Sequence, residues 1–210
     1  DEMPRSLSLV RVKESAESRD AKGRVIEAEE IRDINKIKGR GYNFAIVTEG
    51  KELYVWGDNS YQQIAAGNAG WMQPNGKLRT MQTANKPVKV QVTGEVADEH
   101  GSVLQNVVDI SIGGYASASS DEYSVPVQML AVTMAVEYEY TGGLKRVVSR
   151  TYDSWAWGSN DNNKAAMSQS GIRLARATPI QLFTPTAGVS YLDPGVQLKS
   201  MSAGGNHSAA

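Results

Sequence analysis

Residues 153–161 read DSWAWGSND and residues 52–59 read ELYVWGDN, so an ending of Trp-Gly followed by polar residues occurs twice in the chain. In both copies apolar residues precede the tryptophan, and the glycine after it lets the chain turn. We therefore interpret Trp56, Gly57, Trp157 and Gly158 as structural positions at which a β-strand ends. A ligand-stacking role for the two tryptophans is the alternative, but a bulky residue at a strand end more often serves packing.

A glycine motif comes before each pair of strands. Residues 37–45 read IKGRGYNFA, residues 110–118 read ISIGGYASA and residues 201–209 read MSAGGNHSA. The alignment predicts that each motif begins a repeat, and the unequal spacing of the motifs indicates insertions. The glycines that align are Gly41, Gly114 and Gly205, and the second and third copies complete a glycine pair with Gly113 and Gly204.

The segments between these motifs follow the same order in both copies. An apolar strand (45–48, then 130–133) leads to a strand that ends in Trp-Gly, then to a polar loop, and then to a strand that starts with proline (87–92, then 179–183). Proline is tolerated at the first residue of a strand because the ladder loses nothing there. With the aliphatic stretch before the next glycine motif, this order predicts a four-stranded antiparallel unit used twice.

This order resembles the repeat of the regulator of chromosome condensation family, which starts with Gly-Gly-x-His-Ser-x-Ala-Leu and contains a Trp-Gly strand end and a Pro-Val strand. Residues 203–210 follow that start most closely, with His207 at the histidine position. The chain departs from the family at Arg40, which stands between two glycines, and at Ala116, where the family has histidine. The resemblance implies an all-β fold of β-propeller blades, each a four-stranded antiparallel sheet. Since such rings close with about seven blades, it also implies an incomplete, open propeller segment.

The repeats divide the chain into four parts. We expect residues 1–33 to be the end of a preceding repeat plus a charged connector, 34–107 and 108–198 to be two complete repeats, and 199–210 to begin a third. Because a blade buries its faces only against neighbouring blades, the rest of the propeller would come from a longer parent chain or from self-association. Residues 25–37 fit either a strand or a short amphipathic helix, and the pattern leaves both open.

Insertions into the repeats are the expected places for function, since loops carry specificity on a repeat scaffold. A glycine-rich insertion at 65–86 interrupts the first repeat, and insertions at 119–129 and 134–153 interrupt the second. The last of these alternates tyrosine with glutamate before a Gly-Gly pair, as an extended hairpin does. We predict that the following residues contact a partner: Trp71 and Met72 in the first insertion, Tyr138 and Tyr140 in the hairpin.

The composition of the chain argues against several classes of function. A net charge of −1 over 210 residues offers no basic field for nucleic acid, and no apolar run reaches the length of a membrane span. We therefore expect neither nucleic-acid binding nor membrane insertion. The chain has no cysteine and two histidines, and it shows no catalytic, cofactor-binding or metal-ligating motif. We predict no catalytic residue, no cofactor and no metal.

The leading hypothesis is a non-catalytic scaffold, not an enzyme, that binds a protein partner through its insertions. One alternative is a carbohydrate-binding module with Trp71, Tyr138 and Tyr140 as stacking platforms. The family analogy gives another, a guanine-nucleotide exchange factor, although neither a basic balance nor matching exchange-factor residues are found here. The irregular insertions and the lack of cysteine favour a bacterial or phage surface protein, extracellular rather than cytoplasmic.

Overall fold

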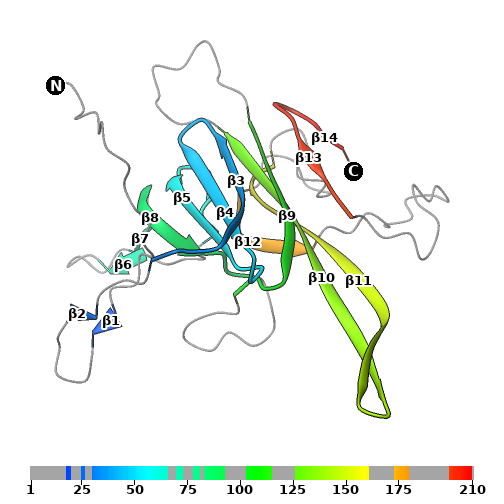
Figure 1. The fold of residues 1–210 in the computed structure, drawn as a ribbon. Helices are drawn as coiled ribbons and strands as arrows, with labels where there is room; N and C mark the ends of the chain where they lie inside the picture. Colours follow the sequence, from blue (N-terminus) through cyan, green and yellow to red (C-terminus); the bar gives the residue numbers. More distant parts are fainter. Residues whose placement is uncertain are drawn as a thin grey trace.

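Figure 1 shows the computed structural model of the chain, which describes residues 18–19, 25–26, 30–65, 70–72, 78–80, 83–92, 103–114, 126–160, 173–179 and 199–209. All regular elements in this part of the chain are β-strands. They form two four-stranded sheets and three two-stranded pairs. The predicted all-β class and the four-stranded antiparallel sheets are therefore confirmed.

The first four-stranded sheet, which we call blade 1, contains β3 (Ile34–Arg40), β4 (Asn43–Thr48), β5 (Leu53–Asp58) and β8 (Thr83–Lys89). The second, blade 2, contains β9 (Val107–Gly114), β10 (Val127–Thr141), β11 (Leu144–Ser159) and β12 (Arg173–Pro179). Each strand of a blade pairs antiparallel with the next one along the chain that belongs to the same sheet. The described residues thus contain one four-strand unit twice, in an arrangement that does not close a ring (Figure 1).

Three short antiparallel pairs accompany the blades: β1 (Ser18–Arg19) with β2 (Val25–Ile26), β6 (Gly70–Met72) with β7 (Leu78–Thr80), and β13 (Ser202–Ala203) with β14 (Ser208–Ala209). The strand β2 and the first part of β3 fall in the stretch 25–37, which fitted strand and helix equally well from the sequence. The structure has strand at residues 25–26 and 34–37 and no helix at the other positions that it describes in this stretch.

The two blades share one register. Trp56 pairs with Phe44 in blade 1, and Trp157 pairs with Met129 in blade 2. The edge strand of each blade bulges opposite the tryptophan. In blade 1, Val55 pairs with Val88 and Gly57 with Ala84; in blade 2, Ala156 pairs with Thr178 and Gly158 with Leu174. The two Trp-Gly pairs therefore occupy equivalent positions at the ends of blade strands, as predicted.

The prediction of proline-led strands is wrong. β8 begins at Thr83 and holds Pro87 in its bulge, whereas Pro179 is the last residue of β12; residues 180–183 lie outside the described part of the chain. In the shared register Pro179 corresponds to Lys89, so the two prolines are not equivalent. Both strands lie at a sheet edge. Proline has no N–H to donate, but at a bulge or a strand end the ladder does not need that hydrogen bond.

The start of the second repeat's inner strand also needs correction. Gln128 pairs with Gly113 and Gly158, just as Asn43 pairs with Arg40 and Gly57. The residue that corresponds to the family's histidine is therefore Gln128 and not Ala116, which lies outside the described residues. Residues 127–129, predicted to belong to the insertion 119–129, already form part of β10. An insertion between the glycine pair and its strand moved the strand start away from its expected place.

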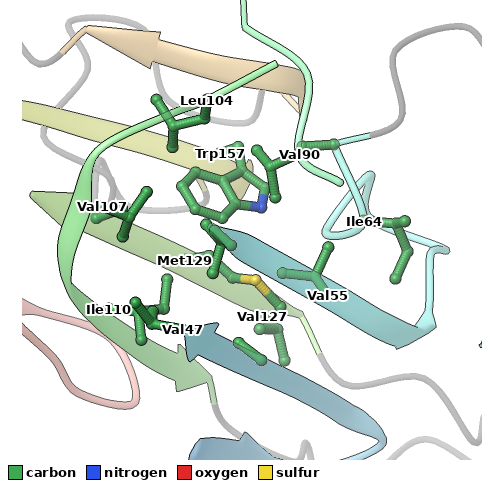
Figure 2. Close-up of a cluster of buried hydrophobic side chains, with 14 of the residues drawn as sticks. Val47, Val55, Ile64, Val90, Leu104, Val107, Ile110, Val127, Met129 and Trp157 are labelled. Carbon is green, nitrogen blue, oxygen red and sulfur yellow. The ribbon is translucent and has the colours of Figure 1, made fainter. Parts of the chain in front are cut away.

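The main core lies between the two blades (Figure 2). Val47, Val55 and other aliphatic residues of blade 1 form one buried cluster with Met129 and Trp157 of blade 2. The indole Nε1 of Trp157 donates a hydrogen bond to the main-chain oxygen of Gln63, at 2.9 Å, in the polar loop after β5. That loop folds on itself, because the Gln63 side chain donates to Asp58 and the Asn59 side chain accepts from the Ile64 N–H. A tryptophan of one blade thus bonds to a folded, internally hydrogen-bonded loop of the other.

Polar contacts fix the joint between β3 and β9. Lys36 Nζ lies 2.7 Å from Asp109 Oδ1, and the guanidinium of Arg40 donates two hydrogen bonds, of 3.0 and 2.9 Å, to the Gly114 oxygen. Gly113 is the counterpart of Arg40 in blade 2, and a Cβ there would lie 2.2 Å from the oxygen of Gly204. The arginine between two glycines in the first motif therefore bridges to the next blade, whereas the glycine in the second motif lets the backbone of residues 199–209 approach.

Replacing Gly57 by alanine is expected to lower the free energy of unfolding by about 3 kcal/mol, because strained backbone and steric overlap add there. Gly57 has φ of 117°, and a Cβ would lie 1.8 Å from the Tyr42 oxygen. Gly50→Ala is the matched control, since its Cβ would meet only the Thr48 hydroxyl at 3.6 Å. Urea denaturation of both variants checks the prediction, and equal midpoints would contradict it.

Candidate functional site

The predicted partner residues lie in two separate places. Tyr138 and Tyr140 lie in β10, while Trp71 and Met72 lie in β6, so the middle of the insertion 65–86 is a strand pair and not only a loop. Figure 1 places β6 and the end of the β10–β11 hairpin on opposite sides of the molecule. The structure therefore does not bring these four residues together into one aromatic platform.

The β10–β11 hairpin is the most prominent insertion. The two strands stay paired from Met134 opposite Tyr152 to Thr141 opposite Leu144, beyond the last pair of β10 with β9, at Thr133. Gly142 and Gly143 connect them with φ of 58° and 82°, which suits a two-residue turn with both central residues at positive φ. The predicted extended hairpin with a Gly-Gly turn is confirmed. Figure 1 shows residues 134–153, which we call the arm, projecting from blade 2.

The arm has one apolar face. Cross-strand pairing places Val136, Tyr138, Tyr140 and Val147 on the same side, and we call this set the apolar face of the arm. Tyr138 is 44% exposed and Tyr140 69% exposed. The opposite side holds Glu137 and Glu139, which share a face as predicted, and Ser149 donates a 2.6 Å hydrogen bond to Glu137. Both exposed tyrosines of the arm thus lie on one side of a projecting ribbon together with Val147, whereas the exposed Leu144 at the turn lies on the other side.

Cations flank the apolar face. Lys145 Nζ lies 3.6 Å from the centre of the Tyr138 ring, a cation–π contact, and Arg150 pairs across the arm with Val136. Neither cation forms an ion pair with any residue that the structure describes. Because the ammonium of Lys145 covers one face of the Tyr138 ring, a sugar could stack only on the other face. This contact therefore weighs against the carbohydrate-platform hypothesis for Tyr138.

A second exposed surface lies on blade 1. It consists of Ile37, Phe44 and Trp56, which lie on the side of blade 1 that faces away from blade 2, and we call it the open face. The face is uncovered only in part, because Ile46 and Tyr54 on the same side are buried and Trp56 also contacts the main cluster. The rings of Phe44 and Trp56 stack at 5.5 Å. Their counterparts in blade 2 are core residues: Ile37 is 62% exposed and Phe44 43% exposed, while Ile110 is 1% exposed and Met129 fully buried. Trp56 is half-buried, and its counterpart Trp157 is fully buried.

Sequence reasoning treated Trp56 as a structural residue and missed Ile37 and Phe44. A signal for them was present in the glycine motifs, because Ile37 aligns with Ile110 and both precede the glycines at the same distance. Phe44 could not be matched to Met129 in the same way, since the insertion before β10 hides their equivalence.

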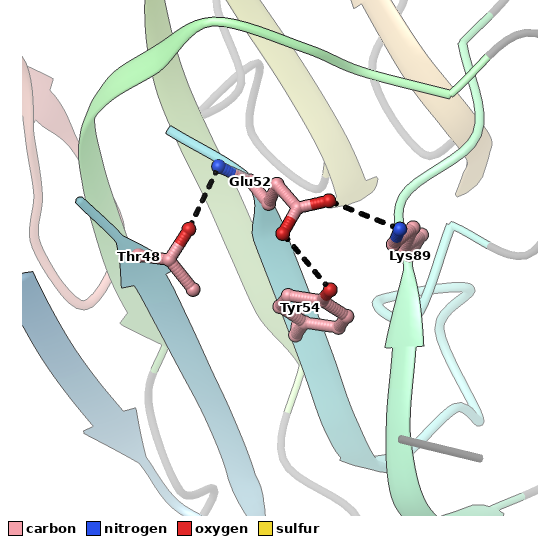
Figure 3. A network of polar contacts seen from close by, with 4 residues as sticks. All are labelled: Thr48, Glu52, Tyr54 and Lys89. Atoms are coloured by element: carbon pink, nitrogen blue, oxygen red, sulfur yellow. Dashed lines mark hydrogen bonds and ion pairs between the residues drawn. The ribbon is translucent and has the colours of Figure 1, made fainter. Parts of the chain in front are cut away.

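A group of connected polar side chains on the surface of blade 1 forms an ordinary ion-pair network (Figure 3). Glu52 lies 3.1 Å from Lys89 Nζ and accepts a hydrogen bond from the Tyr54 hydroxyl, and its N–H donates to the Thr48 hydroxyl. Two open grooves with volumes of about 310 and 430 Å³ share Gly50, Glu52 and Lys89 among their walls. Because the carboxylate and the ammonium neutralise each other and both are about half-exposed, the network supports surface structure more readily than chemistry.

His207, which the sequence predicts to be a structural residue, lies where the third motif meets blade 2. His207 is exposed, and its main-chain oxygen accepts hydrogen bonds from the Gly204 N–H at 2.8 Å and from Gln128 Nε2 at 3.3 Å. His207 thus contacts blade 2 through its backbone, beside the hydrogen bonds of Gly204 and Ala203 to blade 2 and the packing of Met201. Among the described residues there is no cluster of His, Cys, Asp and Glu able to hold a metal ion. The same part of the chain contains no helix long and apolar enough to cross a membrane.

Comparisons with known proteins show a likeness at the level of structure. No protein-family model matches the chain, and no curated protein matches it. The chain is similar to a chain in the crystal structure of Kap60 bound to yeast RCC1 (Prp20), with 14% sequence identity and a TM-score of 0.46. The match covers 87% of this chain and 31% of that chain, so this chain spans about a third of its length.

The class of protein follows from the two sheets. Each blade is a four-stranded antiparallel sheet with the strand order of a propeller blade, and the described blades pack face to face without closing a ring. The protein is an all-β chain of propeller-type blades.

The two tryptophans offer a matched pair for mutation. Trp157→Phe is expected to lower the free energy of unfolding by about 2 kcal/mol more than Trp56→Phe does, because only the former leaves a buried carbonyl unpaired and a gap in a packed core. Trp157 is fully buried and bonded to Gln63, whereas Trp56 is half-buried on the open face. Chemical denaturation measures both, and equal losses of stability would contradict the prediction.

Proposed function

We propose that this chain is a non-catalytic segment of a β-propeller that acts as a scaffold for protein interactions, in which the blades form the frame and the insertions make the contacts. The observation that supports this proposal is the difference between equivalent residues of the two blades. Ile110 and Met129 of blade 2 are buried under blade 1, whereas their counterparts in blade 1, Ile37 and Phe44, are exposed on the open face.

The open face is suited to a further blade. Exposed Ile37 and Phe44 leave apolar area in contact with water, and burying a large apolar side chain contributes about 2 kcal/mol. Blade stacks gain this energy by adding a neighbour on each face. The neighbour would be another propeller blade, supplied by a longer parent chain or by a second copy of this chain.

The joint between the two blades indicates what that neighbour must offer. Blade 1 presents to blade 2 a main-chain oxygen, at Gln63, which accepts the indole hydrogen bond of Trp157. Trp56 is the counterpart of Trp157 in blade 1. Among the described residues, none accepts a hydrogen bond from the indole Nε1 of Trp56. A neighbouring blade with a folded polar loop would present a carbonyl to Trp56 in the same way.

Cysteine labelling tests this proposal, because the chain has no cysteine and a single introduced thiol is unique. Ile37→Cys and the control Leu144→Cys are both placed at exposed positions, 62% and 77% exposed. When the chain is produced with the coding sequence that naturally flanks it, the thiol at position 37 is expected to react with a maleimide at least about ten-fold more slowly than the thiol at position 144.

The same measurement on the 210-residue chain separates the two sources of the neighbour. Protection of position 37 that grows with protein concentration indicates a second copy, and protection only in the longer chain indicates a blade of the same polypeptide. Equal reaction rates at both positions under all these conditions would overturn the proposal.

A further inference from the structure

The apolar face of the arm continues a face that is already an interface at its base. Leu130 and Val132, in the same strand and on the same side, form a buried cluster with Met201 of the third motif, and Tyr152 packs against that cluster. Further along β10, Tyr138 and Tyr140 have no such cover among the described residues. The face therefore runs from a covered base to an uncovered outer part, and a partner bound there would lie beside residues 199–209.

A β-bulge determines the charge of this face. Glu137 pairs with Ser149 and Tyr138 pairs with Val147, so Val148 is the extra residue in β11. Lys145 and Arg150 are five positions apart and would point to opposite sides of a regular strand. The extra residue brings both to the side of the tyrosines, because Lys145 pairs with Tyr140 and Arg150 with Val136.

The two sides of the arm consequently differ in charge. The apolar face carries Lys145 and Arg150 and no acidic side chain, while Glu137 and Glu139 lie on the reverse together with Arg146, which pairs with Glu139. Polar rims of this kind set which partners are accepted, since opposite charges attract and like charges repel across an interface. Two copies packed symmetrically by this face would bring their cations together, which disfavours a symmetric dimer of arms.

We propose that the apolar face of the arm binds an apolar segment of another protein that is flanked by carboxylates; this rests on the scaffold function proposed above. Val136, Tyr138, Tyr140 and Val147 receive the apolar side chains. Lys145 and Arg150 receive the carboxylates, with the planar guanidinium able to hold one bidentately. The surface is small, so the contact is of the weak, transient kind.

Two synthetic peptides test the proposal on the whole 210-residue chain. Both contain the same phenylalanine and leucine residues; one has glutamates between them and its twin has lysines at those positions. Isothermal titration is expected to show at least about ten-fold tighter binding of the acidic peptide, with a loss of affinity on raising the salt concentration. Tyr140→Ser is expected to weaken binding about ten-fold.

A charge reversal provides the decisive comparison. The double variant Lys145→Glu/Arg150→Glu is expected to reverse the preference, so that the basic peptide binds about ten-fold tighter than the acidic one. The control variants Leu144→Ser and Glu139→Gln change the opposite side of the arm and are expected to bind as the unmodified chain does. All substituted positions are exposed, and circular dichroism and urea midpoints verify that the variants remain folded.

Four results would overturn the proposal: equal affinity for the two peptides, no binding of either at about 1 mM, an unchanged preference in the double variant, or equal loss in the Leu144→Ser control. Binding of soluble glucan oligosaccharides that disappears in Tyr140→Ser would replace it with the carbohydrate hypothesis. None of these results bears on the labelling of position 37, so failure of this inference and failure of the scaffold proposal are distinguishable.

Discussion

The packing of the Trp157 indole between the two blades is the interaction on which the rest of the structure depends. Its ring fills the space between the sheets, and its N–H is satisfied by the oxygen of Gln63 in the other blade. A buried indole needs both the apolar surroundings and the acceptor, because an unpaired polar group in a core costs about 1 to 3 kcal/mol. The folded loop after β5 presents the acceptor oxygen, and the positive φ of Gly158 lets the chain turn directly after the tryptophan.

The same requirement explains the asymmetry of the chain. A blade has two apolar faces, and each is stable only against a neighbour. Blade 2 has blade 1 on one face and residues 199–209 on the other, so its residues are buried on both sides. Blade 1 has such a neighbour on one face, and Ile37, Phe44 and Trp56 on the other stand in the positions that form a core in blade 2.

Much of this arrangement could be predicted from local patterns. The glycine motifs and the Trp-Gly endings indicated the four-strand unit, and the alternation around Tyr138 with the Gly-Gly pair indicated the arm, because period two and turn chemistry are local properties of a strand. The proline strands were predicted wrongly, because a bulge shifts register without leaving a mark in the residue pattern. Gln128 was missed because an insertion separates it from the glycine pair.

The sequence by itself therefore determined the repeat, the strand ends and the hairpin, which depend on residues close together along the chain. Only the tertiary structure decided which faces are covered and which charges lie together. Ile37 and Ile110 look alike in the sequence, yet one is exposed and the other buried, because burial depends on a neighbouring blade. Lys145 and Arg150 meet on one side of the arm because one unpaired residue, Val148, changes the side to which every following residue points.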